Sequence, residues 1–227
     1  MNMERLNSHG FVLLENNCWL KYRDNLIQMM LNDFEGKISR LEDLHSVLRK
    51  DEVNDFRLRQ MIKINNDQET INTYLEPFWD DLKPILGPDC LRQKRINLVI
   101  HMPGDESSVI PTHSDVKTGN SSFEIGLWLP LTECLEGNTM TILPYEHFYR
   151  GEWDQNVPIL TDGKDSLLFK HFLPHGNQVN NTNQTRISLN IRFKSLFAPE
   201  NKKNILDYYT TWKISEFSKI ALAHWIN

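Results

Sequence analysis

The residues best suited to chemistry are a His-x-Asp pair, a single later histidine and an arginine that follows it. The pair is His113 and Asp115, the later histidine is His175, and Arg186 lies eleven positions beyond it. Two imidazoles and one carboxylate can occupy one face of an octahedral Fe(II) ion and leave three positions open. A guanidinium can hold a carboxylate through two parallel hydrogen bonds. These four residues therefore predict a mononuclear iron site with a dicarboxylate co-substrate beside it.

The spacing of the His-x-Asp pair suggests how both side chains could reach one ion. Residues i and i+2 of an extended strand lie on the same face, so a strand would direct His113 and Asp115 to the metal and turn Ser114 away. Zinc is an alternative, because two histidines and a carboxylate also serve hydrolytic zinc sites. Those sites usually place two ligands on a helix as His-Glu-x-x-His, a motif that this sequence lacks.

The same alternation applies to the segment around Arg186. Ser188 and Arg192 fall on its face of an extended strand, so Ser188 could add a hydrogen bond to the bound carboxylate. Arg192 is a second candidate for the anchor, but the position of Arg186 relative to His175 favours Arg186. An arginine at the start of a strand can also be a solvated rim residue, and this interpretation stays open.

Other polar or aromatic residues fall on segments that could face the same cavity, and a plain core or hairpin role stays open for each. They are Asn97, His101, Trp128 and the turn of residues 136–139. Asn97 is a candidate for the co-substrate pocket, and Trp128 for its wall. His101 could contact the substrate or the ligating residues. The other histidines, including His147 and His171, are predicted to be structural or exposed.

From residue 94 onward the hydrophobic pattern has a period of two, which is typical of half-buried strands. Glycine, asparagine, proline and aspartate clusters separate the apolar segments at the spacing of a jelly roll or a similar sandwich. The predicted strands lie in residues 95–104, 121–131, 138–144, 165–174 and 185–193. We therefore expect a mostly β, jelly-roll (cupin-like) fold with flanking helices.

The first part of the chain has the signals of supporting helices. Residues 10–16 form a short apolar segment that predicts a first strand, and residues 19–34 have the i, i+3, i+4 spacing of an amphipathic helix. Residues 66–87 predict a second helix, with a kink at Pro77. The charge-rich segment 37–64 has no sustained period. It predicts short helices and loops, which could cover the active site or simply form a solvated surface.

A single domain is expected, because 227 residues suffice for one substantial core. Within it, residues 1–93 would give helical support and a possible lid, and residues 94–197 the jelly-roll core. Residues 198–227 would form C-terminal helices packed on the outside, with helical segments at 205–209 and 212–225.

Composition narrows the class of protein and its partners. The chain has 40% hydrophobic and 24% charged residues and a formal net charge of -5, which argues against nucleic acid as the main partner. No apolar run approaches the length of a membrane span, so no membrane partner is expected. Cys18, Cys90 and Cys134 form no Cys-x-x-Cys pair, and the odd count without a signal peptide predicts reduced thiols in the cytoplasm. The oligomeric state is left open.

Three segments together resemble a known family. They are PTHSD, FEIGLWLPLTECLEGNTMTILP and DSLLFKHFLPHGNQVNNTNQTRISLNIRF. In this order they resemble the Fe(II)/2-oxoglutarate-dependent oxygenases related to phytanoyl-CoA dioxygenase, and within these the carbohydrate oxygenases similar to StrG. The resemblance covers roughly residues 96–197. One departure follows the central strand, where relatives often show Pro-Gly-Ser-His and this chain has Pro-Tyr-Glu-His ending at His147.

The resemblance implies a double-stranded β-helix and a set of roles. His113, Asp115 and His175 would be the iron ligands. Arg186, helped by Ser188, would hold the distal carboxylate of 2-oxoglutarate, and dioxygen would be the second co-substrate.

The activity implied is the hydroxylation or oxidation of a small polar substrate, a sugar or a carbohydrate-containing metabolite. Fold alone does not determine the substrate, so an amino acid, a peptide or a lipid stays an alternative. A non-catalytic jelly-roll module that binds carbohydrate and holds a structural metal is a further alternative. A cupin-like isomerase or hydrolase is the last.

Overall fold

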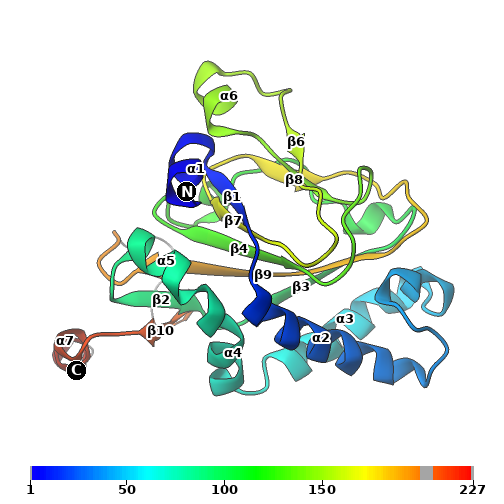
Figure 1. The fold of residues 1–227 in the computed structure, drawn as a ribbon, viewed down its shortest axis with the longest axis horizontal. Coiled ribbons are helices and arrows are strands. Elements are labelled where there is room, and N and C mark those ends of the chain that lie inside the picture. Colours follow the sequence, from blue (N-terminus) through cyan, green and yellow to red (C-terminus); the bar gives the residue numbers. More distant parts are fainter. Residues whose placement is uncertain (1, 200–206, 226–227) are drawn as a thin grey trace.

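The computed structural model describes residues 2–199 and 207–225 and contains two antiparallel β-sheets (Figure 1). The strands are β1 (Phe11–Leu14), β2 (Cys90–Gln93), β3 (Asn97–His101), β4 (Ile125–Pro130), β5 (Met140–Ile142), β6 (Val157–Pro158), β7 (Ser166–Lys170), β8 (His175–Asn177), β9 (Arg186–Ser195) and β10 (Tyr209–Lys213). The larger sheet has the order β1-β7-β4-β9-β2-β10, with β3 also paired to β9, and the smaller sheet has the order β6-β5-β8.

Helices cover the outer face of the larger sheet, where α2, α3 and α4 lie side by side (Figure 1). The α-helices are α1 (Asn2–His9), α2 (Asn17–Leu31), α3 (Val53–Ile64), α4 (Gln68–Leu75), α5 (Trp79–Leu86), α6 (Tyr145–Arg150) and α7 (Glu216–Trp225). The 3-10 segments are η1 (Asn32–Phe34), η2 (Leu41–Ser46), η3 (Lys50–Glu52), η4 (Glu76–Phe78), η5 (Glu106–Ser108) and η6 (Asp115–Thr118).

Strand alternation divides the side chains of the larger sheet between two cores. On β9 the apolar residues face the helices and join the main core, namely Ile187, Leu189, Ile191 and Phe193. Trp128 of β4 points to the other side and belongs to a second apolar cluster with residues of the smaller sheet. The period of two from residue 94 onward therefore correctly predicted strands whose side chains alternate between two faces. The polar residues of β9 are left facing the space between the two sheets.

Strand β9 is the structural centre of that space because it has three partners. Residues 188–193 pair with β4 along one edge. Along the other edge, residues 186–190 pair with β3 and residues 193–195 with β2. A strand that is hydrogen-bonded on both edges is held rigidly, so its side chains are well positioned for a site.

The predicted N-terminal elements are present. Asn16 caps α2 by accepting a hydrogen bond from the Trp19 amide, and Asp67 caps α4 through the amides of Glu69 and Thr70. Pro77 lies in the 3-10 segment η4, which interrupts the helical run between α4 and α5. The segment without a period forms η2, η3 and α3.

The prediction that the His-x-Asp pair lies on a strand is wrong. His113 forms only an isolated bridge with His175, and Asp115 begins the 3-10 segment η6, which is followed by Gly119 with a positive φ of 95°. Asp115 is therefore oriented by a tight turn. A two-residue spacing fits such a turn as well as it fits a strand, which is why the pattern alone did not distinguish them.

The prediction of helices in the C-terminal segments 205–209 and 212–225 is wrong in part. Residues 205 and 206 lie outside the described residues, while Tyr209–Lys213 form β10 and pair with β2, and α7 begins only at Glu216. The segment YTTWK is rich in aromatic and β-branched residues, which suit a strand. The edge of β2 supplies the backbone partners for it.

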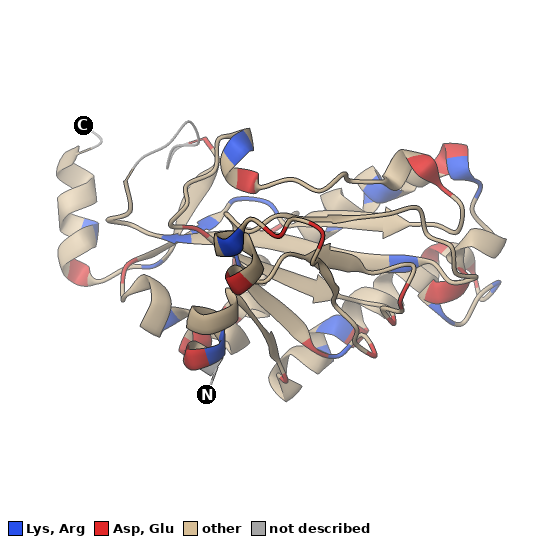
Figure 2. Cartoon of the chain, turned by 90° about the horizontal axis from the view of Figure 1, so that it is seen from above, with Lys and Arg blue, Asp and Glu red and all other residues tan. Residues whose placement is uncertain are grey.

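Charged residues gather on the helices and connecting loops (Figure 2). Cys90 and Cys134 are buried, Cys18 is exposed, and all three are free. Among the described residues, none of the helices combines the length and the apolar character needed to span a lipid bilayer.

Candidate metal and co-substrate site

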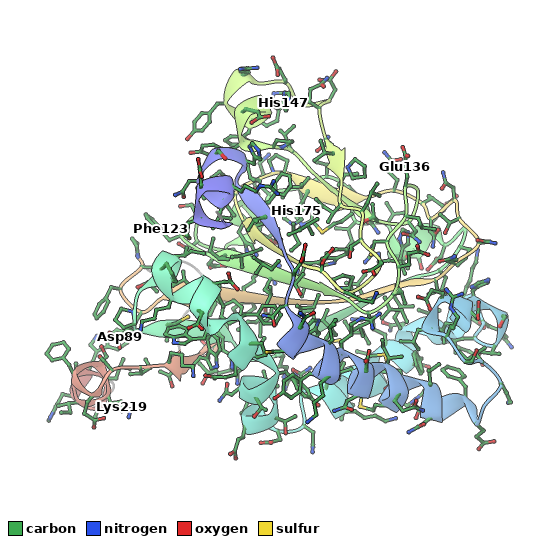
Figure 3. All side chains as sticks on the ribbon, in the orientation of Figure 1. Asp89, Phe123, Glu136, His147, His175 and Lys219 are labelled. Carbon is green, nitrogen blue, oxygen red and sulfur yellow. The ribbon has the colours of Figure 1, made fainter. Side chains whose placement is uncertain are left out.

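The structure brings His113, Asp115 and His175 together, although they are far apart in the sequence. One ligand atom from each lies within 4.8 Å of the others. The backbones of the two histidines exchange hydrogen bonds, with N···O distances of 2.9 Å in both directions. His113 Nε2 lies 3.7 Å from Asp115 Oδ1, and His175 Nε2 lies 3.7 Å from Asp115 Oδ2. His175 belongs to β8 of the smaller sheet (Figure 3).

Both imidazoles are oriented through their Nδ1 atoms. His113 Nδ1 lies 2.9 Å from the Pro111 carbonyl oxygen, and His175 Nδ1 lies 2.9 Å from that of Leu173. A carbonyl oxygen only accepts, so each Nδ1 carries a proton and each Nε2 is the ring atom directed at Asp115. The contact with Asp115 raises the pKa of His113. Metal-ligating histidines are usually fixed in this way. Burial lowers the pKa of His175 to about 4, so this imidazole is neutral at neutral pH.

Asp115 completes a donor set that fits a divalent cation. Its side chain is buried, and Oδ2 has no hydrogen-bond partner among the described residues. Burial alone would raise the pKa of Asp115, but its contact with His113 and the charges of His171 and Arg192 outweigh this and lower the pKa well below its usual range. A buried, ionised carboxylate with an oxygen that accepts no hydrogen bond, beside the Nε2 atoms of two imidazoles, is a suitable metal ligand.

A guanidinium fixes the other oxygen of this carboxylate. Arg192 Nη2 donates to Asp115 Oδ1 over 3.0 Å. Arg192 Nη1 donates to the Tyr208 hydroxyl over 2.9 Å and to Gln93 Oε1 over 3.3 Å. Burial would lower the pKa of Arg192, but the charge of Asp115 raises it. The guanidinium of Arg192 is therefore paired with the metal-ligand candidate.

His171 lies on the buried side of Asp115 and was not expected there. Its Nδ1 is 3.2 Å from Asp115 Oδ2 and 3.5 Å from Glu124 Oε2, and the side chain is fully buried. Gly126 makes room for it, because a Cβ at position 126 would lie 2.3 Å from His171 Nε2. The prediction that His171 is structural or exposed did not foresee this contact. The bend after β7 brings it there, and the sequence has no periodic signal for such a bend.

Arg186 faces the same cavity but has a different environment. Its Nη1 donates to Ser188 Oγ over 2.7 Å and its Nε to the Asn138 carbonyl over 3.1 Å. The guanidinium carbon lies 5.9 Å from the Trp128 ring centroid. No carboxylate among the described residues forms an ion pair with Arg186, and burial lowers its pKa. The guanidinium is oriented by neutral groups alone.

One cavity of about 280 Å³ connects the two parts of the site. His113, His175 and Arg186 line it, as do the predicted candidates Asn97 and Trp128. A cavity of this size can hold a small dicarboxylate beside a metal ion. The structure therefore places a possible metal site and a buried cation in this one cavity, which we call the metal chamber.

The remaining candidates lie behind or away from this chamber. His101 is fully buried, and its Nδ1 lies 3.1 Å from the Asn138 carbonyl and 3.5 Å from Arg186 Nη2. The turn of residues 136–139 thus reaches the site through the backbone of Asn138. His147 lies on α6, outside the chamber, where it contacts Glu152 over 2.6 Å (Figure 3).

Known proteins were compared with the chain by sequence and by structure. No protein-family model matches the chain. It is 25% identical to the streptomycin biosynthesis protein StrG of Streptomyces griseus, over 88% of this chain and 96% of StrG. The chain is a homologue of StrG. The resemblance seen in the sequence is thereby confirmed.

Solved structures confirm the fold of this StrG homologue. The nickel complex of ThoJ, a non-haem monooxygenase, superposes with a TM-score of 0.56 at 18% identity, over 98% of this chain and 93% of ThoJ. HygX from Streptomyces hygroscopicus, solved with nickel and 2-oxoglutarate bound, has a TM-score of 0.51 at 12% identity, over 88% of each chain. The jelly-roll prediction is therefore confirmed.

Sequence reasoning also missed Arg57 in this StrG homologue. Arg57 lies on α3 and lines the metal chamber, although α3 belongs to the outer helical layer. Its segment shows no regular period, so no pattern indicated which of its charged residues faces inward. Asn177 of β8 was missed as well, and it lines the chamber next to His175.

Proposed function

We propose that this StrG homologue is an Fe(II)- and 2-oxoglutarate-dependent oxygenase that hydroxylates or oxidises a sugar or a carbohydrate-containing metabolite. One observation carries the proposal. His113 and His175, which form a donor set with Asp115, line the same cavity as the buried guanidinium of Arg186, which has no anionic partner among the described residues. The nickel and 2-oxoglutarate in HygX and the name of StrG support the co-substrate and the biosynthetic setting.

The metal ligands would bind the ion from one side. His113 and His175 would each bind through Nε2, because Nδ1 is engaged by a backbone carbonyl, and Asp115 would supply a charged oxygen while Arg192 holds its other oxygen. Three protein ligands leave the remaining positions to the co-substrate and dioxygen. Bound Fe(II) would activate dioxygen, the oxidant, with 2-oxoglutarate as the two-electron donor that is converted to succinate and carbon dioxide, while the protein would supply the geometry.

Arg186 would bind the distal carboxylate of 2-oxoglutarate. Ser188 and Asn138 accept its hydrogen bonds and thereby hold the guanidinium in one orientation. Ser188 thus orients the arginine, and its own O–H group could still donate to the bound carboxylate. Trp128, Met140 and Phe169 form apolar walls of the chamber. They would exclude water and strengthen the ion pair between Arg186 and the carboxylate.

A non-catalytic carbohydrate module with a structural metal is the rival function. A structural metal site is normally closed by protein ligands, and neutral sugars need no buried cation. The unpaired Arg186 beside an incomplete ligand set therefore favours the oxygenase. A cupin-like isomerase or hydrolase would have no use for a dicarboxylate at Arg186 either.

The test measures the co-substrate first and the substrate second. Calorimetry of nickel-loaded protein should give saturable, metal-dependent binding of 2-oxoglutarate. Fe(II)-loaded protein should then convert 2-oxoglutarate to succinate faster when the correct substrate is present, in a screen of sugars, nucleotide sugars, amino acids, peptides and lipids. Metal binding without any 2-oxoglutarate binding would refute the oxygenase and favour the structural-metal module.

A further inference from the structure

A second cavity adjoins the metal chamber on its outer side. Its volume is about 310 Å³, and it lies between α3, β3 and the 3-10 segment η5. The two cavities have four wall residues in common, which are Arg57, Leu98, Val99 and Ile110. A ligand that extends out of the chamber would therefore pass Arg57 and enter this outer cavity.

The walls of the outer cavity are basic. Arg57 and Lys50 contribute two positive charges, and Asp105 is the one acidic residue that lines the cavity in the described part of the chain. Asp105 is buried, and its Oδ1 accepts hydrogen bonds from the Ser107 amide and hydroxyl over 3.0 and 2.7 Å. Its charge is thus engaged by the cap of η5.

Both cations have only neutral partners among the described residues. Arg57 Nη2 donates to Asn54 Oδ1 over 2.8 Å and Nη1 to Met61 Sδ over 3.3 Å. Lys50 Nζ donates to the Gly104 carbonyl over 2.6 Å. Of the acids next to Lys50 in the sequence, Asp51 pairs with Arg49 and Glu52 accepts a hydrogen bond from the Arg49 amide. A half-buried guanidinium without a counter-charge on a cavity wall is suited to an anionic ligand group.

We propose that the outer cavity binds an anionic group of the substrate, a phosphate or a carboxylate, between Arg57 and Lys50. This inference rests on the proposed oxygenase function and narrows its substrate class. The substrate is then a sugar phosphate, a nucleotide sugar or a sugar acid, and neutral or cationic sugars are disfavoured. The reacting part lies in the metal chamber, and the anionic part lies outside it at α3.

The experiment compares matched sugars on the assembled site. Protein loaded with nickel and 2-oxoglutarate is titrated calorimetrically with glucose 6-phosphate, UDP-glucose, glucuronate, glucose and glucosamine. Because the co-substrate occupies the metal and Arg186, a further anion must bind elsewhere. We expect at least one anionic sugar to bind tenfold or more tightly than glucose, and this preference to weaken as salt is added. The phosphate and carboxylate probes show which anion is preferred.

Two substitutions on α3 distinguish a direct contact between Arg57 and the anion from an effect of the net charge of the protein. Arg57→Gln should remove the preference for the anionic sugar, with about tenfold weaker binding. Arg59→Gln removes an equal charge from α3, but Arg59 is exposed, lies against Phe56 and lines neither cavity. It should bind like the unaltered protein. Thermal melting confirms that both variants fold.

The proposal is overturned if all five sugars bind alike, if none binds saturably, or if the two variants behave the same. Failure of the oxygenase function looks different, because nickel or 2-oxoglutarate would then fail to bind before any sugar is added. In that case the same titrations of metal-free protein still report on the site at Arg57.

Discussion

The two ends of strand β9 each bring an arginine to one chamber, but the two arginines have different partners. Arg192, near the end of the strand, pairs with the carboxylate of Asp115 and donates to Tyr208 and Gln93. Arg186, at its beginning, donates to the hydroxyl of Ser188 and to a backbone carbonyl.

This difference assigns a separate task to each end of the strand. Burying a cation without a counter-charge is unfavourable, and the pKa of Arg186 is lowered accordingly, whereas that of Arg192 is raised by Asp115. An enzyme gains from such an unpaired cation only when a ligand supplies the anion. We therefore infer that Arg192 serves the metal ligands and Arg186 the co-substrate.

The largest effect is expected for Asp115, because both metal binding and 2-oxoglutarate turnover would depend on it. Asp115→Ala should weaken nickel binding by at least 100-fold and abolish 2-oxoglutarate-dependent succinate formation, because it removes the one charged ligand. Calorimetry and a succinate assay measure this. Asp162→Ala, which alters an exposed aspartate paired with Lys164, is the control. Full turnover of the Asp115 variant would contradict the metal assignment.

Arg186 tests the co-substrate end of the strand. Arg186→Met should weaken 2-oxoglutarate binding by about 10- to 100-fold, the range expected for losing a hydrogen-bonded ionic contact. Nickel binding should change little, because Arg186 contacts none of the three metal-ligand candidates. Calorimetric titration of nickel and then of 2-oxoglutarate separates the two effects. Equal losses in both titrations would break the division of tasks.

Arg192 should show the reverse pattern with a smaller effect. Arg192→Met leaves the three ligands in place but frees Asp115 Oδ1, so nickel binding should weaken by about tenfold, as for other residues that orient metal ligands. The affinity of the metal-loaded protein for 2-oxoglutarate should stay within a few-fold of the original. If this variant lost 2-oxoglutarate binding as Arg186→Met does, Arg192 would be the anchor instead.

The last prediction concerns stability rather than ligand binding, and the residue is His101, beside Arg186. Burial, together with the charge of Arg186, lowers the pKa of His101 to about 4. Between the ordinary histidine pKa of about 6.5 and this value, the unfolded chain binds a proton that the folded chain refuses. Stability should therefore fall as the pH drops from 6.5 to 4, by up to about 1.4 kcal/mol per pH unit for this residue.

Guanidinium unfolding of metal-free protein at a series of pH values measures this slope. His175, whose pKa is also lowered to about 4, contributes in the same direction. His101→Gln should give a shallower slope than the unaltered protein. An identical slope in that variant would show that His101 does not carry the effect.

The different roles of Arg186 and Arg192 depend on contacts with residues that are distant in the sequence. Alternation alone placed Arg186, Ser188 and Arg192 on one face of a strand, and the structure has them there. It left open which arginine anchors a co-substrate, because the answer depends on Asp115, which reaches Arg192 from a separate turn. Arg57 was missed for the same reason, since α3 has no local signal for the face that meets β3.

Residue types and short-range periodicity determined strands β1, β3, β4, β5, β7 and β9, the main helices before the core and the set of side chains that can bind a metal. These properties follow from side-chain chemistry and from the repeat of two or 3.6 residues, which each segment carries on its own. Only the tertiary structure decided that Asp115 sits on a turn, that His171 lies behind it, and that Arg192 pairs with it while Arg186 does not. Those outcomes depend on contacts between distant segments, such as the bridge between His113 and His175, and no local pattern encodes them.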